Sequence, residues 1–395
     1  MSSVPHLGGA ESAAFMKRRT WGEDRRLVGQ LNVGFWVLAS AAVLAWQPAL
    51  PDVGPFETWA LICMMTIGLQ FPFDLWGGFV LPTRHGRSVR RFGHWASAWL
   101  AGVLVYTSVL FACGALLMGA SSRFGAAGAL GIAAGSFVVL IAAQAPLSAA
   151  VGYLASTVSS RRVRRLAYRA GLDPALVRVC RSDDVSFVGG WLGLPALETL
   201  VLPRRWVDQL SDDSLVAALV RRQVALESGR RGLGVGAAGA FNLAGLALSV
   251  LVFLPGGPTS VSQLVVLAAA MTLWGFVGLL TLPRLSRRAV LEIDQEAAAV
   301  LSPGQIESLI RTLDRDQDDE WCRGPLTEYI FHPVPTPDNR IAALNGPGRT
   351  DKLPTSPWRV TRTALFTSMA FGGLLGRAVH CNIGRPDLWV VFSGD

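Results

Sequence analysis

The chain has 395 residues, of which 51% are hydrophobic and 16% charged, whereas about 25% are charged in a typical soluble domain. This composition excludes an ordinary soluble globular protein. The formal net charge of +8 would suit a nucleic-acid-binding protein, but the basic residues lie between long apolar runs. We therefore expect the lipid bilayer, and no nucleic acid, as the partner of this charge.

Six apolar runs are long enough to cross a membrane, because a bilayer core of about 30 Å needs roughly 20 apolar residues in a helix. They are residues 29–47, 57–80, 95–118, 127–156, 234–255 and 262–283. The runs are continuous and show no alternation of apolar and polar residues, which favours helices over the strands of a barrel. The predicted fold class is therefore mostly α, a polytopic helical membrane protein with about six spans.

The basic residues alternate from loop to loop. They are concentrated at 17–26, 84–91, 161–169 and 284–288, whereas the intervening loops contain at most Arg123. Basic loops of a membrane protein stay in the cytoplasm. The pattern predicts a multi-pass protein of the inner (plasma) membrane, with both termini and two soluble segments in the cytoplasm.

These features divide the chain into six parts. We expect a cytoplasmic N-terminus, four transmembrane helices, a first soluble segment, a transmembrane hairpin, a second soluble segment and a C-terminal tail, over residues 1–28, 29–156, 157–232, 233–284, 285–350 and 351–395. The tail holds an apolar patch at 363–376, which is short for a span. It could form an interfacial helix or a seventh span.

The soluble segments form a small α+β domain in this prediction. The first should contain a basic helix at 161–170, then strands at 176–180, 185–188 and 199–202. A further helix should begin after Ser211, a good N-cap, and end near Ser228 before Gly229. The second segment predicts helices at 286–301, at 303–314 and near Asp338.

Four features in this order resemble the membrane-embedded zinc metallopeptidases of the CAAX prenyl endopeptidase and HtpX type. The helix after Ser211 is followed by the transmembrane hairpin and then by Glu292-Ile-Asp-Gln-Glu296-Ala, similar to the family's Glu-x-x-x-Asp followed by Ala. His332-Pro333 and Arg340-Ile-Ala-Ala-Leu344 resemble the family's His-Pro and Arg-Ile-x-x-Leu. The resemblance covers residues 155–348 and implies a metallopeptidase-like fold for the soluble domain.

The sequence departs from this family at the residues that carry the chemistry. The family's helix contains His-Glu-x-x-His, in which two histidines bind zinc and the glutamate acts as general base. In that register this chain has Arg221, Arg222 and Ala225. Of the three ligands that the resemblance implies, Glu292 alone remains, and Glu296 stands where the family has Asp. We therefore expect no metal, no other cofactor and no hydrolysis.

Arg221 could replace the metal by pairing with Glu292, because a guanidinium forms bidentate hydrogen bonds with carboxylates. The alternative is that Arg221 and Arg222 are solvated and that Glu292 pairs with Arg288, one turn earlier.

Three other residues are open to two interpretations. His332 could line the former site or belong to a turn, and Arg340 more simply orders that loop than contacts a substrate. Asp74 lies at membrane depth, where an ionisable residue suggests function, although a salt bridge to the basic loop 84–91 would also explain it.

The first functional interpretation is a catalytically inactive relative of these peptidases that binds peptides, lipidated tails or membrane-protein clients. A second is an active membrane metalloendopeptidase with non-standard ligands. Its candidate ligands are Cys180, Cys322, His332, Glu292 and Glu296. A third is a transporter, but few ionisable residues lie in mid-span and no pair of broken helices is evident.

Overall fold

A computed structural model describes residues 19–47, 50, 54–88, 91–151, 160–182, 184–317, 319–320, 323–346, 373–378 and 383–385. The patch predicted at 363–376 lies mostly outside the described residues, and only its last four residues are within them.

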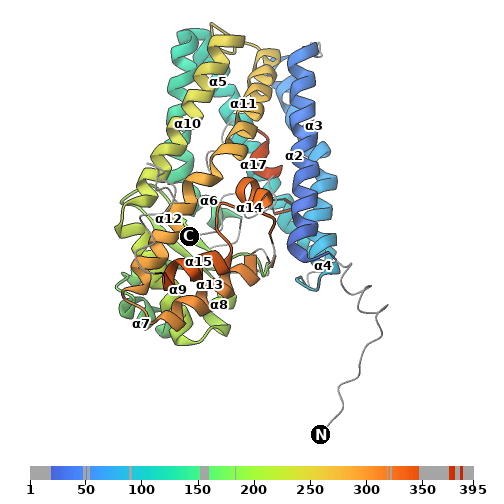
Figure 1. Ribbon diagram of the computed structural model, residues 1–395. Helices are drawn as coiled ribbons and strands as arrows, with labels where there is room; N and C mark the ends of the chain where they lie inside the picture. Colours follow the sequence, from blue (N-terminus) through green and yellow to red (C-terminus); the bar gives the residue numbers. More distant parts are fainter. Residues whose placement is uncertain are drawn as a thin grey trace.

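Long helices form one half of the molecule (Figure 1). They are α2 (Trp21–Trp46), α3 (Pro55–Leu75), α5 (Phe92–Ala142), α10 (Arg230–Phe253) and α11 (Val261–Thr281). α3 continues through a π-helical turn, η1 (Trp76–Val80), and α4 (Leu81–Arg84). By length and composition these make five helices able to cross a membrane among the described residues. The chain is thus a mostly helical, multi-pass membrane protein, as the sequence predicts.

The third and fourth apolar runs both fall largely within α5, which has 51 residues. Gly125 interrupts it with φ 60° and ψ −144°, a conformation that glycine adopts without the steric cost of a Cβ atom. Residues 92–124 and 126–142 are therefore separate helical arms, and α6 (Gln144–Ala150) follows the second arm. The six apolar runs therefore correspond to five long helices, because the third and fourth runs share α5.

The part of the chain that lies outside the long helices begins with α7 (Arg161–Arg169) and the 3-10 turn η2 (Pro174–Leu176). A three-stranded sheet follows, with β1 (Val177–Cys180), β2 (Gly190–Leu192) and β3 (Thr199–Pro203) in the order β1-β3-β2. β1 runs parallel to β3, and β2 runs antiparallel to it. The first and third strands lie where the sequence predicts them.

The prediction of a strand at 185–188 is wrong. There Asp184 forms a side-chain turn, in which its Oδ1 accepts from the backbone N–H of Ser186 at 2.9 Å. Such local hydrogen bonds compete with strand pairing. The second strand begins only after Gly189, whose φ is +77°.

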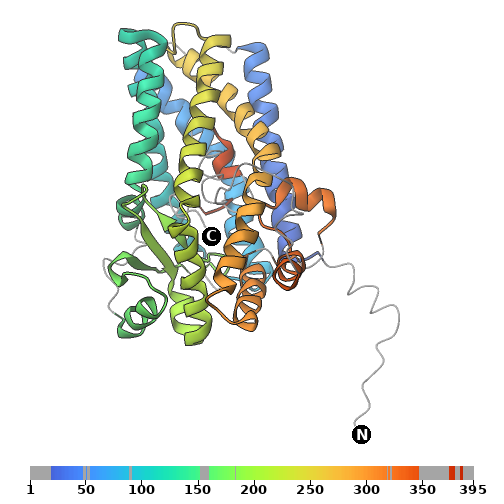
Figure 2. The same ribbon diagram turned by 60° about the vertical axis from the view of Figure 1, so that its left-hand side comes forward.

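Helices complete the domain around the sheet, which packs beneath the long helices (Figures 1 and 2). They are α8 (Arg204–Gln209), α9 (Asp212–Glu227), α12 (Pro283–Ala298), α13 (Pro303–Gln317), α14 (Pro325–Phe331) and α15 (Pro337–Asn345). α9 begins as predicted, because Ser211 Oγ accepts from the N–H of Ser214 at 3.2 Å, and Gly229 follows its end with φ +68°. α14 was not expected from the sequence. A shared apolar core, with Trp191, Trp206 and Leu215 fully buried, joins α9 to the sheet and α13.

Candidate functional site

The degenerate motif lies on the inner face of α9. Arg221, Arg222 and Ala225 are all buried. The alternative in which the two arginines are solvated is therefore wrong. Arg230 and Arg231, at the start of α10, are buried as well.

Arg221 and Arg340 meet at one carboxylate. Arg221 Nε donates to Asp294 Oδ1 at 2.7 Å, while Arg340 donates from Nε to Oδ2 at 2.7 Å and from Nη2 to Oδ1 at 2.9 Å. Asp294 is fully buried. Burial alone would raise the pKa of its carboxyl, but the charges and hydrogen bonds of Arg340 and Arg221 outweigh it and hold the pKa below its usual value. Asp294 thus joins α9, α12 and α15.

The prediction that Arg221 replaces the metal by pairing with Glu292 is wrong in its partner, although the link between α9 and α12 is present. Arg230 Nη2 donates to Glu292 Oε2 at 3.3 Å, and Arg288 Nε donates to Glu292 Oε1 at 2.8 Å. The alternative pair of Glu292 with Arg288 is therefore formed. Glu296 accepts from Arg230 at 2.6 and 3.0 Å.

Arg222 connects α9 to the sheet side of the domain. Its Nη2 donates to the carbonyl oxygen of Val188, and its guanidinium lies 4.9 Å from the centre of the Trp206 ring. The Nε1–H of Trp191 donates to the carbonyl oxygen of Arg222 at 2.9 Å. The contacts of Arg222 are thus structural ones within the domain.

His332 is buried and belongs to a different group of side chains. Its Nε2 lies 3.4 Å from Glu320 Oε2, and Arg26 of α2 pairs with the same carboxylate. Burial opposes ionisation of Glu320, yet His332 and Arg26 lower its pKa. The hydrogen bonds of Asp294 come from Arg221 and Arg340, so Arg340 is central to that cluster, whereas His332 pairs with Glu320.

The donor set does not fit zinc. A zinc site needs three or four ligands of His, Cys or carboxylate type, and no such group of three occurs among the residues that the structure describes. A buried guanidinium stands at the Arg221 position, and the charge of Glu292 is compensated by two arginines. Cys180 is buried in an apolar cluster with Phe187, and Cys322 lies outside the described residues.

Sequence reasoning overlooked Asp294, and its expectation that Arg230 and Arg231 are solvated is wrong, because both are buried. Asp294 stood within the quoted Glu292–Glu296 motif, so an available signal was passed over. Arg231 donates to the Glu198 carboxylate at 3.2 Å and to the carbonyl oxygen of Gly193, contacts that the sequence gives no means to foresee.

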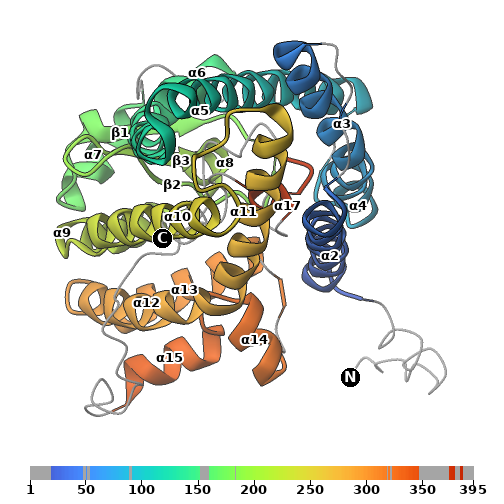
Figure 3. The same cartoon turned by 90° about the horizontal axis from the view of Figure 1, so that it is seen from above.

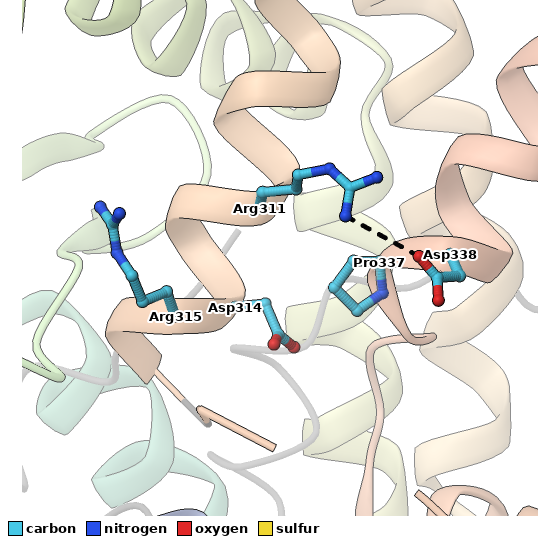
Figure 4. A pocket seen from close by; sticks show the side chains of 5 residues that line it. All are labelled: Arg311, Asp314, Arg315, Pro337 and Asp338. Carbon is cyan, nitrogen blue, oxygen red and sulfur yellow. Dashed lines mark ion pairs between the residues drawn. The ribbon is translucent and has the colours of Figure 1, made fainter. Parts of the chain in front are cut away.

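A small pocket lies apart from these residues, between α13 and the start of α15 (Figure 4). Its lining is Arg311, Asp314, Arg315, Pro337 and Asp338. Arg311 Nη1 lies 3.8 Å from Asp338 Oδ1, with both side chains largely exposed. The pocket contains none of the degenerate motif positions.

No known sequence family matches this chain, and no curated protein matches it. The fold is similar to the crystal structure of S. mikatae Ste24p, with a TM-score of 0.61 over 79% of this chain and 81% of that one. At 16% sequence identity this similarity concerns the fold. The protein therefore has a Ste24-like fold, in which Arg221, Asp294 and Arg340 form a buried ionic cluster.

Proposed function

We propose that this chain is a catalytically inactive membrane protein with a peptidase-like fold, which binds peptide, lipidated or membrane-protein clients and does not cleave them. The observation that carries the proposal is the guanidinium of Arg221, bound to the buried carboxylate of Asp294 at 2.7 Å. The resemblance to the CAAX prenyl endopeptidase type, together with the similarity of the fold to that of Ste24p, supports a polypeptide client.

Charge argues against a metal at this position. Arg221, Arg230 and Arg288 bring three positive charges to the carboxylates of α12, so a dication would meet repulsion rather than free ligands. Without a metal, the pKa of a bound water stays far above neutrality. Arg222, already bound to a carbonyl oxygen and an indole ring, offers no general base.

The contact between Arg340 and Asp294 supports a second register for α12. If Asp294 is the counterpart of the Asp in the family's Glu-x-x-x-Asp, the ligand position falls four residues earlier, on the buried Val290. Asp294 is followed by Gln295 in this register, and Ala297 comes three residues after it. In this register all three ligands of the family are replaced.

Zinc content separates the two registers and tests the proposal. The purified wild-type protein should contain no zinc above background. Restoring the motif with Arg221→His, Arg222→Glu and Ala225→His should produce zinc binding only when Val290→Glu is added, if the second register is correct. Binding by the triple variant alone would favour Glu292 as ligand.

Stoichiometric zinc in the wild type that disappears in a Glu292→Ala variant would overturn the proposal and support the active peptidase with non-standard ligands. The location in the inner membrane with cytoplasmic termini belongs to the same proposal. Cysteine labelling from each side of the membrane at the α10–α11 turn and at the N-terminus tests it.

A further inference from the structure

Part of the C-terminal tail lies inside the set of long helices. Viewed from above, α17 (Leu375–Ala378) is enclosed by α2, α3, α5 and α11 (Figure 3). Leu375 and Ala378 are fully buried and pack against Val33 and Trp36 of α2. The N–H of Leu374 donates to Thr272 Oγ1 of α11 at 3.2 Å. The tail is thus held by two membrane helices at this point.

The tail makes a second contact at Gly384. Its N–H donates to Asp74 Oδ1 at 3.2 Å, and its carbonyl oxygen accepts from Trp95 Nε1 at 3.4 Å. Its φ of +71° favours glycine. A Cβ atom on Gly78 of η1 would lie 2.0 Å from the carbonyl oxygen of Gly384. Two glycine backbones therefore pass each other at a distance that excludes any side chain.

Hydrogen bonds from neighbouring side chains hold the carboxylate of Asp74 in the orientation of this contact. Gln70 Nε2 donates to Oδ1 at 3.1 Å and Trp99 Nε1 donates to Oδ2 at 2.9 Å, while Trp36 Nε1 fixes the Gln70 amide at 2.7 Å. An acidic residue at membrane depth is costly and usually functional. The salt bridge between Asp74 and the basic loop 84–91 stays a prediction, because residues 89 and 90 of that loop lie outside the described residues.

The third contact is ionic. Arg385 is buried, pairs through Nε with Asp184 and donates from Nη2 to Ser186 Oγ at 2.9 Å. Burial works against ionisation of Asp184, but the charges of Arg385 and Arg25 lower its pKa. The turn at 184–186, where the sequence predicts a strand, therefore binds a cationic side chain of the tail.

We propose that the space between α2, α3, α11 and the turn at 184–186 is a binding site for a polypeptide segment with a glycine followed by a cationic residue, and that residues 373–378 and 383–385 of the tail are its ligand in cis. This rests on the proposed function, because it names the chemistry of the client. A client with an apolar stretch, a glycine and an arginine or lysine competes with the tail for Asp74 and Asp184.

Accessibility of a buried tail position tests whether the tail occupies the site. In a cysteine-free full-length chain, Ala378→Cys should react slowly with a maleimide in detergent. Adding Gly384→Leu should increase the labelling rate at least tenfold, because the leucine side chain would clash with Gly78. Arg385→Glu should have the same effect, because it places a carboxylate next to Asp184. The control Gly68→Leu lies on the same helix as Asp74, where an added Cβ meets nothing within 4 Å, and should leave the rate unchanged.

A peptide in trans tests whether the site accepts a separate ligand. A fluorescent peptide with the sequence of residues 373–385 should bind the Gly384→Leu chain, bind the wild type at least tenfold more weakly, and lose binding when Arg385 in the peptide is replaced by Glu. Adding Gly78→Leu to the chain should abolish binding. A matched melting temperature of the variants shows that they remain folded.

Equal binding of the peptide to wild-type and Gly384→Leu chains, or fast labelling of Ala378→Cys in an otherwise unchanged tail, would overturn the inference. No binding to a Gly384→Leu chain whose tail is released would also overturn it. These outcomes are independent of zinc content, on which the proposed function stands or falls.

Discussion

Replacing Asp294 with Asn should destabilise the protein far more than the loss of one surface charge. The carboxylate accepts three hydrogen bonds of 2.7 to 2.9 Å from Arg221 and Arg340 and is fully buried. The amide is nearly isosteric but leaves two buried guanidinium groups without a counter-charge. Removing one partner of a buried ionic pair costs about 3–5 kcal/mol.

The assay is the melting temperature of the purified protein in detergent, followed by size-exclusion chromatography after heating. At about 2–4 °C for each kcal/mol, the expected loss is about 6–20 °C. Asp208→Asn is the matched control, because Asp208 pairs with Arg204 at 3.3 Å while both side chains are about 60% exposed. An exposed pair contributes about 0–1 kcal/mol. Losses within 2 °C of each other for the two variants would refute the assignment of Asp294 as the residue that joins α9, α12 and α15.

Three further outcomes are expected. The pKa of Asp294 in the folded protein lies below the unfolded value of about 3.9. Its stabilisation is therefore present above about pH 3.9 and is lost as the pH falls through the folded-state pKa. The difference in melting temperature between wild type and Asp294→Asn should be constant from pH 5 to 8 and shrink below about pH 4. Gly245→Ala should cost about 1–3 kcal/mol, because its Cβ would lie 2.2 Å from Trp274, whereas Gly236→Ala on the same helix meets nothing; equal melting temperatures would contradict the packing of α10 on α11. Arg222→Leu should lower the melting temperature by several degrees through the loss of a buried charged hydrogen bond and a cation–π contact, and an unchanged value would mean that this arginine is dispensable.

The sequence was most informative where the signals are local. The ends of α9 follow from Ser211 and Gly229, and the long helices follow from continuous apolar runs of about 20 residues. These features depend on residues within one or two turns of each other, so they can be read without knowledge of the fold.

Partner choice could not be predicted in the same way. Glu292 and Asp294 are two residues apart and therefore point to nearly opposite sides of α12, about 160° apart. Which of them faces Arg221 depends on the rotation of α12, and that rotation is set by packing against α9 and α15, whose contacts are distant in sequence. The contacts of Gly384 with Asp74, 310 residues away, are beyond sequence reasoning for the same reason.

The connection between α9 and α12 through Arg221 and Asp294 has a consequence for how the protein matures. A guanidinium keeps its proton throughout the physiological pH range, and the aspartate loses its charge only in strong acid. All components of this connection are encoded in the chain, so it is complete once folding ends. Under the proposed function, assembly of the domain around the sheet requires no metal loading, and chelators or zinc limitation in the cell should leave its abundance unchanged.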